Sequence, residues 1–438
     1  MERRTFLALL GSPVVLALLQ ACGGDSERDA REDADVGPNA DLARSNLQRE
    51  TTCICDAAKA AASVNAFGFD LYRSLASAAP VSNLVFSPTS IAIALAMTRA
   101  GASGTTATEM DVVLHVADPA LLAPAMNAMT TSLAERTQTI AVPGSDPIEI
   151  RLAIANSLWA QSGFPFEQPF LDVLASQYGA GVELVDFRGA PAAAVGSING
   201  WVDDATEGRI PALLSPDSVD ALTRLVLVNA IYMKAPWLLP FTKTATVSAP
   251  FTVPGGRTVQ VDMMRRSAYL PYATGVGWTA VELPYEGQLL SMVLVLPDAG
   301  VAPADVLDSF DDLADAAALE NRQVMVGLPK FDTQTSVELG DALAALGMPT
   351  AFGDGADFSA MSTAEPFTIS GVIHQANITV DEDGTEAAAA TAVMMAGSAV
   401  PAEPVELTFD RPFLFAIRDR PTGTILFLGH IADPTATS

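Results

Sequence analysis

Seven β-branched, turn-bounded runs in the last two thirds of the chain constrain its fold more than any other feature. Several of these runs are apolar on both faces, which is typical of strands in the middle of a large, covered sheet. Half of the 438 residues are apolar, so the chain can supply such a core. The seven predicted strands are residues 149–161, 222–237, 290–297, 322–331, 369–382, 405–419 and 423–434.

The first third of the chain shows helical spacing instead. Apolar residues recur with a helical period over residues 59–77, and a second helix is expected from Ser90 to about Ala100, where Gly101 ends it. A short third helix follows, and residues 119–137 form another. Helices first and strands after predict one α+β domain over residues 58–438, with the helices packed on a large mixed sheet.

The first 22 residues predict an export signal rather than part of the fold. Arg3 and Arg4 resemble a twin-arginine signal, and the apolar run that follows is too short and too interrupted for a membrane span. The run ends at Leu19-Gln20-Ala21-Cys22, which resembles a bacterial lipobox with an unusual residue at Gln20. We expect Cys22 to be lipidated and to anchor an exported protein to the cell envelope, unless the protein is released to the exterior.

Residues 23–57 are polar and acidic and predict a disordered tether between anchor and domain. A flexible coil of this kind reaches roughly 30 Å. Cys53 and Cys55 are too close for an unstrained disulfide and too few for a metal site, so we expect no functional role for them.

The composition argues against several classes of function. A net charge of −27 disfavours binding to nucleic acid or to anionic lipid headgroups. The three histidines, His115, His374 and His430, lie in no metal-binding motif, and the chain has neither a nucleophile elbow nor a phosphate-binding loop. We therefore expect no enzyme activity, no metal and no cofactor.

Six motifs in the chain resemble the serpins, a family of serine protease inhibitors. They follow the family's order from about residue 60 to 433 and are NLVFSPTSIAIALAMTRAGASGTTATEM, INGWVDDATEGRIPALL, LVLVNAIYMKAPWLLPF, VGLPKFDTQTSVELGDALAALGM, DGTEAAAATA and FDRPFLFAIRD. The resemblance implies three β-sheets, eight or nine helices and an exposed reactive loop at about residues 382–404. It also implies a monomer that inhibits a protease as a suicide substrate, with the cleaved loop inserting into the main sheet and trapping the covalent acyl-enzyme.

The start of this loop matches the family's hinge. Read locally, its alanine-rich run predicts a helix that ends at Gly397, but small neutral side chains at alternate positions also suit a strand that enters a closed sheet. Residues 382–400 contain no proline that would block ladder hydrogen bonds. The residues that match the hinge are Glu382, Gly384, Thr385, Glu386, Ala387, Ala388, Ala389, Ala390 and Thr391.

Family spacing places the scissile bond between Ser398 and Ala399, fourteen residues after Gly384. The loop is about three residues longer than in familiar relatives, so the bond falls within residues 394–400. Its surroundings are small and apolar, without a basic residue, which favours elastase-like or subtilisin-like proteases over trypsin-like ones.

Two further sets of residues take their roles from the resemblance. Ser87, Ser90, Asn229 and His374 match the shutter cluster, a polar group under the main sheet where strands must part. Trp237, Lys330 and Glu382 match the breach cluster at the top of the sheet, where insertion begins. His374 could equally be a static core histidine whose hydrogen bonds are satisfied.

Two other functions stay open at this point. The same loop could inhibit papain-like cysteine proteases, or the protein could be a non-inhibitory serpin that acts as a binding module. Some relatives bind heparin through a basic helix, but residues 119–137 hold only Arg136 as a basic residue, so we expect no polyanion cofactor.

Overall fold

The computed structural model describes residues 41–51, 57–144, 146–308, 310, 319–385 and 404–436. Within these residues the chain forms seven α-helices and two large mixed β-sheets. No helix among them is long and apolar enough to cross a membrane. The helices are α1 (Ala57–Ala78), α2 (Pro88–Arg99), α3 (Gly104–Val113), α4 (Leu122–Ala134), α5 (Gln168–Val173), α6 (Pro191–Ala205) and α8 (Gly340–Leu346).

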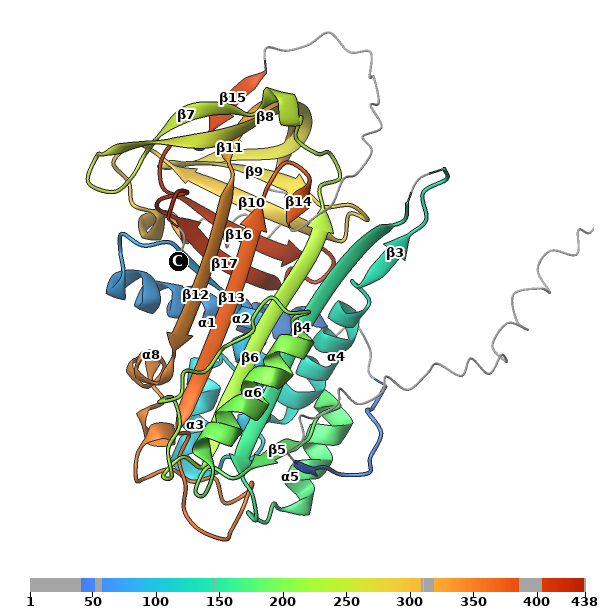
Figure 1. Ribbon diagram of the computed structural model, residues 1–438, viewed down its shortest axis with the longest axis vertical. Helices are drawn as coiled ribbons and strands as arrows, with labels where there is room; N and C mark the ends of the chain where they lie inside the picture. The colour runs from blue at the N-terminus through green and yellow to red at the C-terminus, as the bar shows by residue number, and fades with distance from the viewer. Residues whose placement is uncertain are drawn as a thin grey trace, which may run out of the picture. The chain divides into compact units, whose positions relative to one another are not determined.

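The first sheet, which we call the main sheet, contains the longest buried strands. Its order is β1 (Asp41–Ala43), β5 (Val182–Val185), β4 (Ile148–Gln161), β6 (Leu225–Pro236), β14 (Gly384–Thr385), β13 (Gly371–Val380) and β12 (Phe331–Glu338), with β3 (Gln138–Ile140) paired to β4. In Figure 1 helix α6 lies over the front of β4 and β6, while α1 and α2 lie behind the sheet. The two covering layers explain why β6 is buried at every residue except Lys234.

The second sheet lies at the upper end of the molecule in Figure 1 and has nine strands. Along its path it runs β15 (Val405–Thr408), β11 (Glu320–Pro329), β8 (Thr258–Gly275), β9 (Trp278–Pro284), β10 (Leu290–Pro297), β16 (Phe413–Asp419), β17 (Ile425–Ile431) and β2 (Leu84–Phe86), with β7 (Val247–Thr252) on β8. The described strands form two hydrogen-bonded sheets where three were expected. The reason is β8, an 18-residue strand that pairs with β11 over most of its length and with β9 at its end, and so joins what would otherwise be separate sheets.

The pairing of β6 with β13 decides where the functional site lies. The two strands run parallel and are hydrogen-bonded from Gly371 opposite Val226 to Ala376 opposite Ile231. Above this point they separate, and β14 lies between their upper ends as a short antiparallel strand. Figure 1 shows β14 at the top of β6 and β13. The main sheet therefore holds two residues of an additional strand in a gap that closes further down.

Residues 41–51 correct one expectation from the sequence. They were predicted to belong to a disordered tether, but β1 pairs with β5 at the edge of the main sheet. Arg49 Nε donates to Asn127 Oδ1 on α4 at 2.8 Å, and the Glu50 amide donates to the Ser176 carbonyl at 2.7 Å. Edge pairing and side-chain hydrogen bonds hold this segment against the domain, which polarity alone could not reveal. Residues 23–40 and 52–56 of the predicted tether, and the export signal, lie outside the described residues.

Candidate functional site

The hinge begins inside the main sheet. Gly384 pairs with Pro236 and Thr385 pairs with Ala235 on β6, while Thr385 also faces Val380 on β13. Gly384 has φ +155°, and a Cβ atom there would collide with the Ala235 carbonyl and lie 2.6 Å from Pro236 Cα. Only glycine fits this close approach between two strands, which explains the residue at this position.

Glu382 lies just before β14 and is held from two sides. Lys330 Nζ lies 2.8 Å from Glu382 Oε2, and Thr246 Oγ1 donates to Glu382 Oε1 at 2.7 Å. Burial by itself raises the pKa of Glu382, but these hydrogen bonds outweigh it and keep the pKa below its usual value. The predicted pair of Lys330 and Glu382 is thus present in the structure, and it fixes the residue at which the hinge enters the sheet.

Trp237 lies beside the same entry point. Its Nε1 donates to the Asp381 carbonyl at 3.0 Å and its amide donates to the Asp383 carbonyl at 2.9 Å. Its ring is fully buried and stacks on Tyr285, with centroids 4.5 Å apart and planes 10° from parallel. The three residues predicted for the breach cluster therefore lie close together, and the buried Trp237 ring packs beside the point where the hinge enters the sheet.

The shutter cluster lies lower in the main sheet, where β6 and β13 are still paired. His374 on β13 lies opposite Asn229 on β6, and His374 Nδ1 is hydrogen-bonded to Asn229 Oδ1. His374 Nε2 accepts a hydrogen bond from the Ser87 amide at 3.0 Å. Ser87 also caps helix α2, because its hydroxyl accepts from the Ser90 amide at 3.0 Å. One histidine thus bridges two strands and a helix start.

Asn229 leaves one polar group of this cluster unpaired. Its side chain is fully buried, and among the described residues its Nδ2 has no hydrogen-bond partner. Ser90 Oγ donates instead to Asn156 Oδ1 on β4 at 2.9 Å, so the cluster extends one strand further than predicted. A buried donor without a partner costs about 1–3 kcal/mol in general. The closed sheet therefore has an unfavourable buried polar group at the point where β6 and β13 are paired.

Some predicted residues lie outside the described part of the chain. These are the scissile pair Ser398 and Ala399, the lipidation residue Cys22, and the remainder of the hinge, which comprises Glu386, Ala387, Ala388, Ala389, Ala390 and Thr391.

Three residues of the site were not predicted from the sequence. Tyr285 is hydrogen-bonded to Thr385, Thr246 donates to Glu382, and Asn156 accepts from Ser90. Asn156 interrupts an apolar strand, so a polar residue in a buried run was the one available signal. Tyr285 and Thr246 carried no such signal, because they lie next to strand ends, Tyr285 directly after β9 and Thr246 directly before β7, where polar residues are ordinary.

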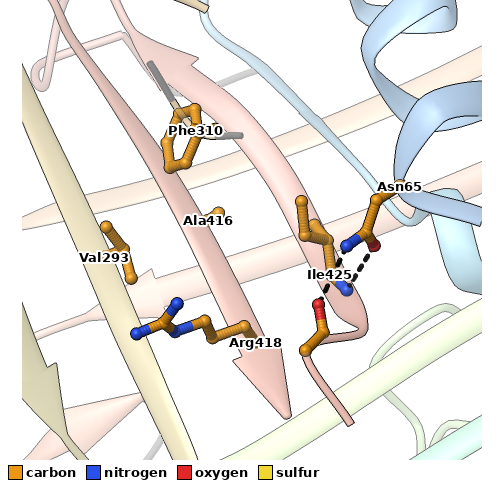
Figure 2. A pocket seen from close by; sticks show the side chains of 7 residues that line it. Asn65, Val293, Phe310, Ala416, Arg418 and Ile425 are labelled. Carbon is orange, nitrogen blue, oxygen red and sulfur yellow. Dashed lines mark hydrogen bonds between the residues drawn. The ribbon is translucent and has the colours of Figure 1, made fainter. Parts of the chain in front are cut away.

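A small cavity lies away from the hinge, between α1, β10 and the β16–β17 hairpin (Figure 2). The side chains of Asn65 and Arg418 in its lining both bond to neighbouring groups. Asn65 Nδ2 donates to the Gly423 carbonyl at 2.9 Å, the Ile425 amide donates to Asn65 Oδ1 at 2.9 Å, and Arg418 pairs with Glu282 at 3.1 Å. These bonds attach α1 to the start of β17, and we assign no ligand to the cavity.

The comparisons with known proteins agree with this geometry. The family model described as serpin (serine protease inhibitor) matches residues 62–434. The chain belongs to the serpin family. An uncharacterised serpin-like protein of Thermococcus kodakarensis is 39% identical over 380 residues, which cover 85% of each chain. The leukocyte elastase inhibitor of Bos taurus is 37% identical over 380 residues, covering 84% of this serpin and 97% of the bovine protein.

Solved structures extend the likeness to the fold. Tengpin, a thermophilic serpin in its native state, matches with a TM-score of 0.76 and 26% identity, covering 90% of this chain and all of tengpin. Uncleaved ovalbumin matches with a TM-score of 0.74 and 28% identity, covering 85% of this chain and 99% of that one. The α+β serpin fold expected from the sequence is confirmed, with seven described helices in place of the eight or nine expected.

The shutter histidine gives this serpin a testable pH dependence. Burial lowers the pKa of His374 from 6.5 to about 3, and a proton on Nε2 would also break the bond from the Ser87 amide. A lowered histidine pKa means that the unfolded chain binds the proton first. The resulting stability is fully present above pH 6.5 and is lost as the pH falls from there toward 3, by up to about 1.4 kcal/mol per pH unit.

We expect His374→Gln to flatten this acid-side loss, measured as urea unfolding midpoints at pH 7, 6 and 5. His430, whose pKa burial lowers to about 4, still contributes its own share of the slope in the variant. His115→Gln is the control, because His115 lies at the surface beside Asp70. Equal slopes in the wild type and in both variants would contradict the assignment.

Proposed function

We propose that this serpin is a suicide-substrate inhibitor of extracytoplasmic serine proteases and not a catalyst. The observation that carries the proposal is β14, which already occupies the entry to the gap between β6 and β13. It is antiparallel to both neighbours, as a complete inserted strand would be. The rest of the hinge would extend this strand downward as β6 and β13 separate.

The ladder registers predict where each loop residue would arrive. Thr385 lies between Ala235 and Val380, and each further step along the loop moves one residue back along both neighbouring strands. Thr391 would then arrive between Asn229 and His374. Its hydroxyl could replace their direct hydrogen bond and accept from the unpaired Asn229 Nδ2. Insertion would therefore relieve a polar cost of the closed sheet as well as form new ladder bonds.

The covalent step follows ordinary serine protease chemistry. The protease serine oxygen attacks the carbonyl carbon of Ser398, the peptide bond to Ala399 breaks, and the amine of Ala399 leaves with the proton taken from the serine. An ester now joins the two proteins. Water would hydrolyse this ester in a normal turnover, but we propose that strand insertion carries the protease away and distorts its active site first.

The loop sequence sets the proposed target class. Residues 385–404 contain no Lys or Arg, and the residues around Ser398 are small and apolar. A trypsin-like primary pocket, which pairs an Asp with a basic side chain, would find no partner there. The bovine relative is named as an inhibitor of leukocyte elastase, and this agrees with an elastase-like or subtilisin-like target.

Incubation with elastase, subtilisin, trypsin and papain tests the proposal. We expect an SDS-stable complex with elastase or subtilisin, little with trypsin, and a loop cut that mass spectrometry places within residues 394–400. A complex formed only with papain would support the cysteine protease alternative. Cleavage of the loop without any stable complex would support a non-inhibitory binding module and reject the proposal.

A charged residue at position 391, which is predicted to arrive between the shutter residues Asn229 and His374, tests strand insertion itself. Thr391→Arg would put a guanidinium between Asn229 and His374 under a closed sheet, and burying an unpaired charge is very costly. We expect this variant to become a substrate, with more than about ten molecules consumed for each protease molecule inhibited.

Ala388→Arg is the matched control, because residue 388 would point to the opposite face of the strand, beside the partly exposed Asn377 and away from the buried cluster under α6. We expect this control to remain an inhibitor close to the wild type. Equal behaviour of the two variants would show that the loop does not enter in this register.

We also propose that Cys22 carries a lipid anchor that holds the inhibitor at the cell envelope. The support is the signal-like sequence of residues 1–22, which precede the matched serpin region. In a bacterial host the wild type is expected in the membrane fraction and Cys22→Ser in the soluble fraction of the envelope. If both proteins fractionate together, the anchor assignment is wrong.

A further inference from the structure

Tyr285 lies where the two sheets meet, directly beside the first residues of the hinge. It follows β9 of the second sheet and forms an isolated bridge with Trp237, which follows β6 of the main sheet. Both side chains are fully buried, and their rings stack face to face. Trp237 is fixed in turn by its hydrogen bond to the Asp381 carbonyl. The Tyr285 ring therefore has little freedom to move.

The hydroxyl of Tyr285 makes one direct contact with the hinge. It lies 2.7 Å from Thr385 Oγ1, and Thr385 is only 2% exposed. Burial raises the pKa of Tyr285, so the hydroxyl stays protonated and can donate at every ordinary pH. Buried hydroxyl groups require partners, so the Tyr285 hydroxyl would lose its hydrogen-bond partner if the hinge withdrew.

We propose that Tyr285 is a positioning residue for inhibition: its hydroxyl bond to Thr385 holds Gly384 and Thr385 in the gap between β6 and β13 before any protease arrives. This inference rests on the proposed inhibitory function. Thr385 already has the register that it would keep in a complete inserted strand. With Tyr285 in place, the loop has to extend a strand that exists, and it does not have to find the gap after cleavage.

Loss of the Tyr285 hydroxyl should change two rates in opposite directions, and this distinguishes a positioning role from simple stabilisation of the fold. If the hydroxyl is lost, the protein's own hinge leaves the gap more often, so its insertion after acylation is slower. The vacated entry then admits a separate peptide of the same sequence more readily. A general loosening of the sheet would speed both processes, because both require β6 and β13 to part.

Tyr285→Phe tests the proposal, because the phenyl ring keeps the stack on Trp237 and removes only the hydroxyl. Tyr178→Phe is the matched control, since Tyr178 is a partly buried tyrosine on another element whose hydroxyl is buried and has no partner among the described residues. The first readout is the number of inhibitor molecules consumed for each elastase or subtilisin molecule inhibited. The second is the rate at which a synthetic peptide of residues 385–396 enters the intact protein, followed on native gels.

For Tyr285→Phe we expect a higher consumption of inhibitor and a peptide incorporation roughly two- to tenfold faster, as the loss of one hydrogen bond predicts. Tyr178→Phe should match the wild type in both measurements. Thr385→Val, which removes the other hydroxyl, should act in the same direction, and the double variant should be no worse than the stronger single one. Additive effects would mean that the two hydroxyl groups act separately, and this would overturn the proposal.

Equal values for Tyr285→Phe and Tyr178→Phe in the two readouts would also overturn it. If the wild type forms no covalent complex with any protease, the inhibitory function proposed above fails. Peptide incorporation still decides the role of Tyr285 in that case, because it needs no protease.

Discussion

The parallel pairing of β6 with β13 is the constraint on which the rest of this structure depends. The two strands run parallel, are hydrogen-bonded over their lower part and separate above Ala376. The sheet is open at one end and closed at the other, so the backbone groups of β6 and β13 at the open end can gain further hydrogen bonds if another strand enters there. We call the path from the open end to the closed part the insertion route. The breach and shutter clusters lie at the two ends of this route.

The polar groups along this route form two sets, one at the entry and one where the strands are still paired. At the entry, Lys330, Thr246 and Trp237 fix the chain just before β14, so the loop starts from a defined point. At the closed part, His374 and Asn229 hold the strands together but leave Asn229 Nδ2 without a partner. The first set resists withdrawal of the hinge, whereas the second makes the closed sheet less than optimal. Both features support the proposed insertion of the loop.

Much of the fold followed from pattern alone. The helix predicted over residues 59–77 is α1 (Ala57–Ala78), and the long apolar runs became β4, β6, β10, β11, β13, β16 and β17. The strand β12 and the helices α5 and α6 were not singled out by periodicity. Only Phe331 and Val337 of β12 are apolar, and α5 has only six residues, so neither segment shows a clear apolar pattern in the sequence. Residues 41–51 were assigned to a tether because their polarity hides the edge pairing of β1.

The sequence by itself determined the chemistry of the site, namely a run of small neutral residues after Gly384 and the polar side chains His374, Asn229, Lys330 and Glu382. Those identities are local, and they suit the proposed entry of a strand into the sheet. Only the tertiary structure decided which groups meet across 100 or more residues, as Tyr285 meets Thr385 and His374 meets Asn229. Such contacts depend on strand register, and register is set by the packing of both sheets together rather than by any one segment.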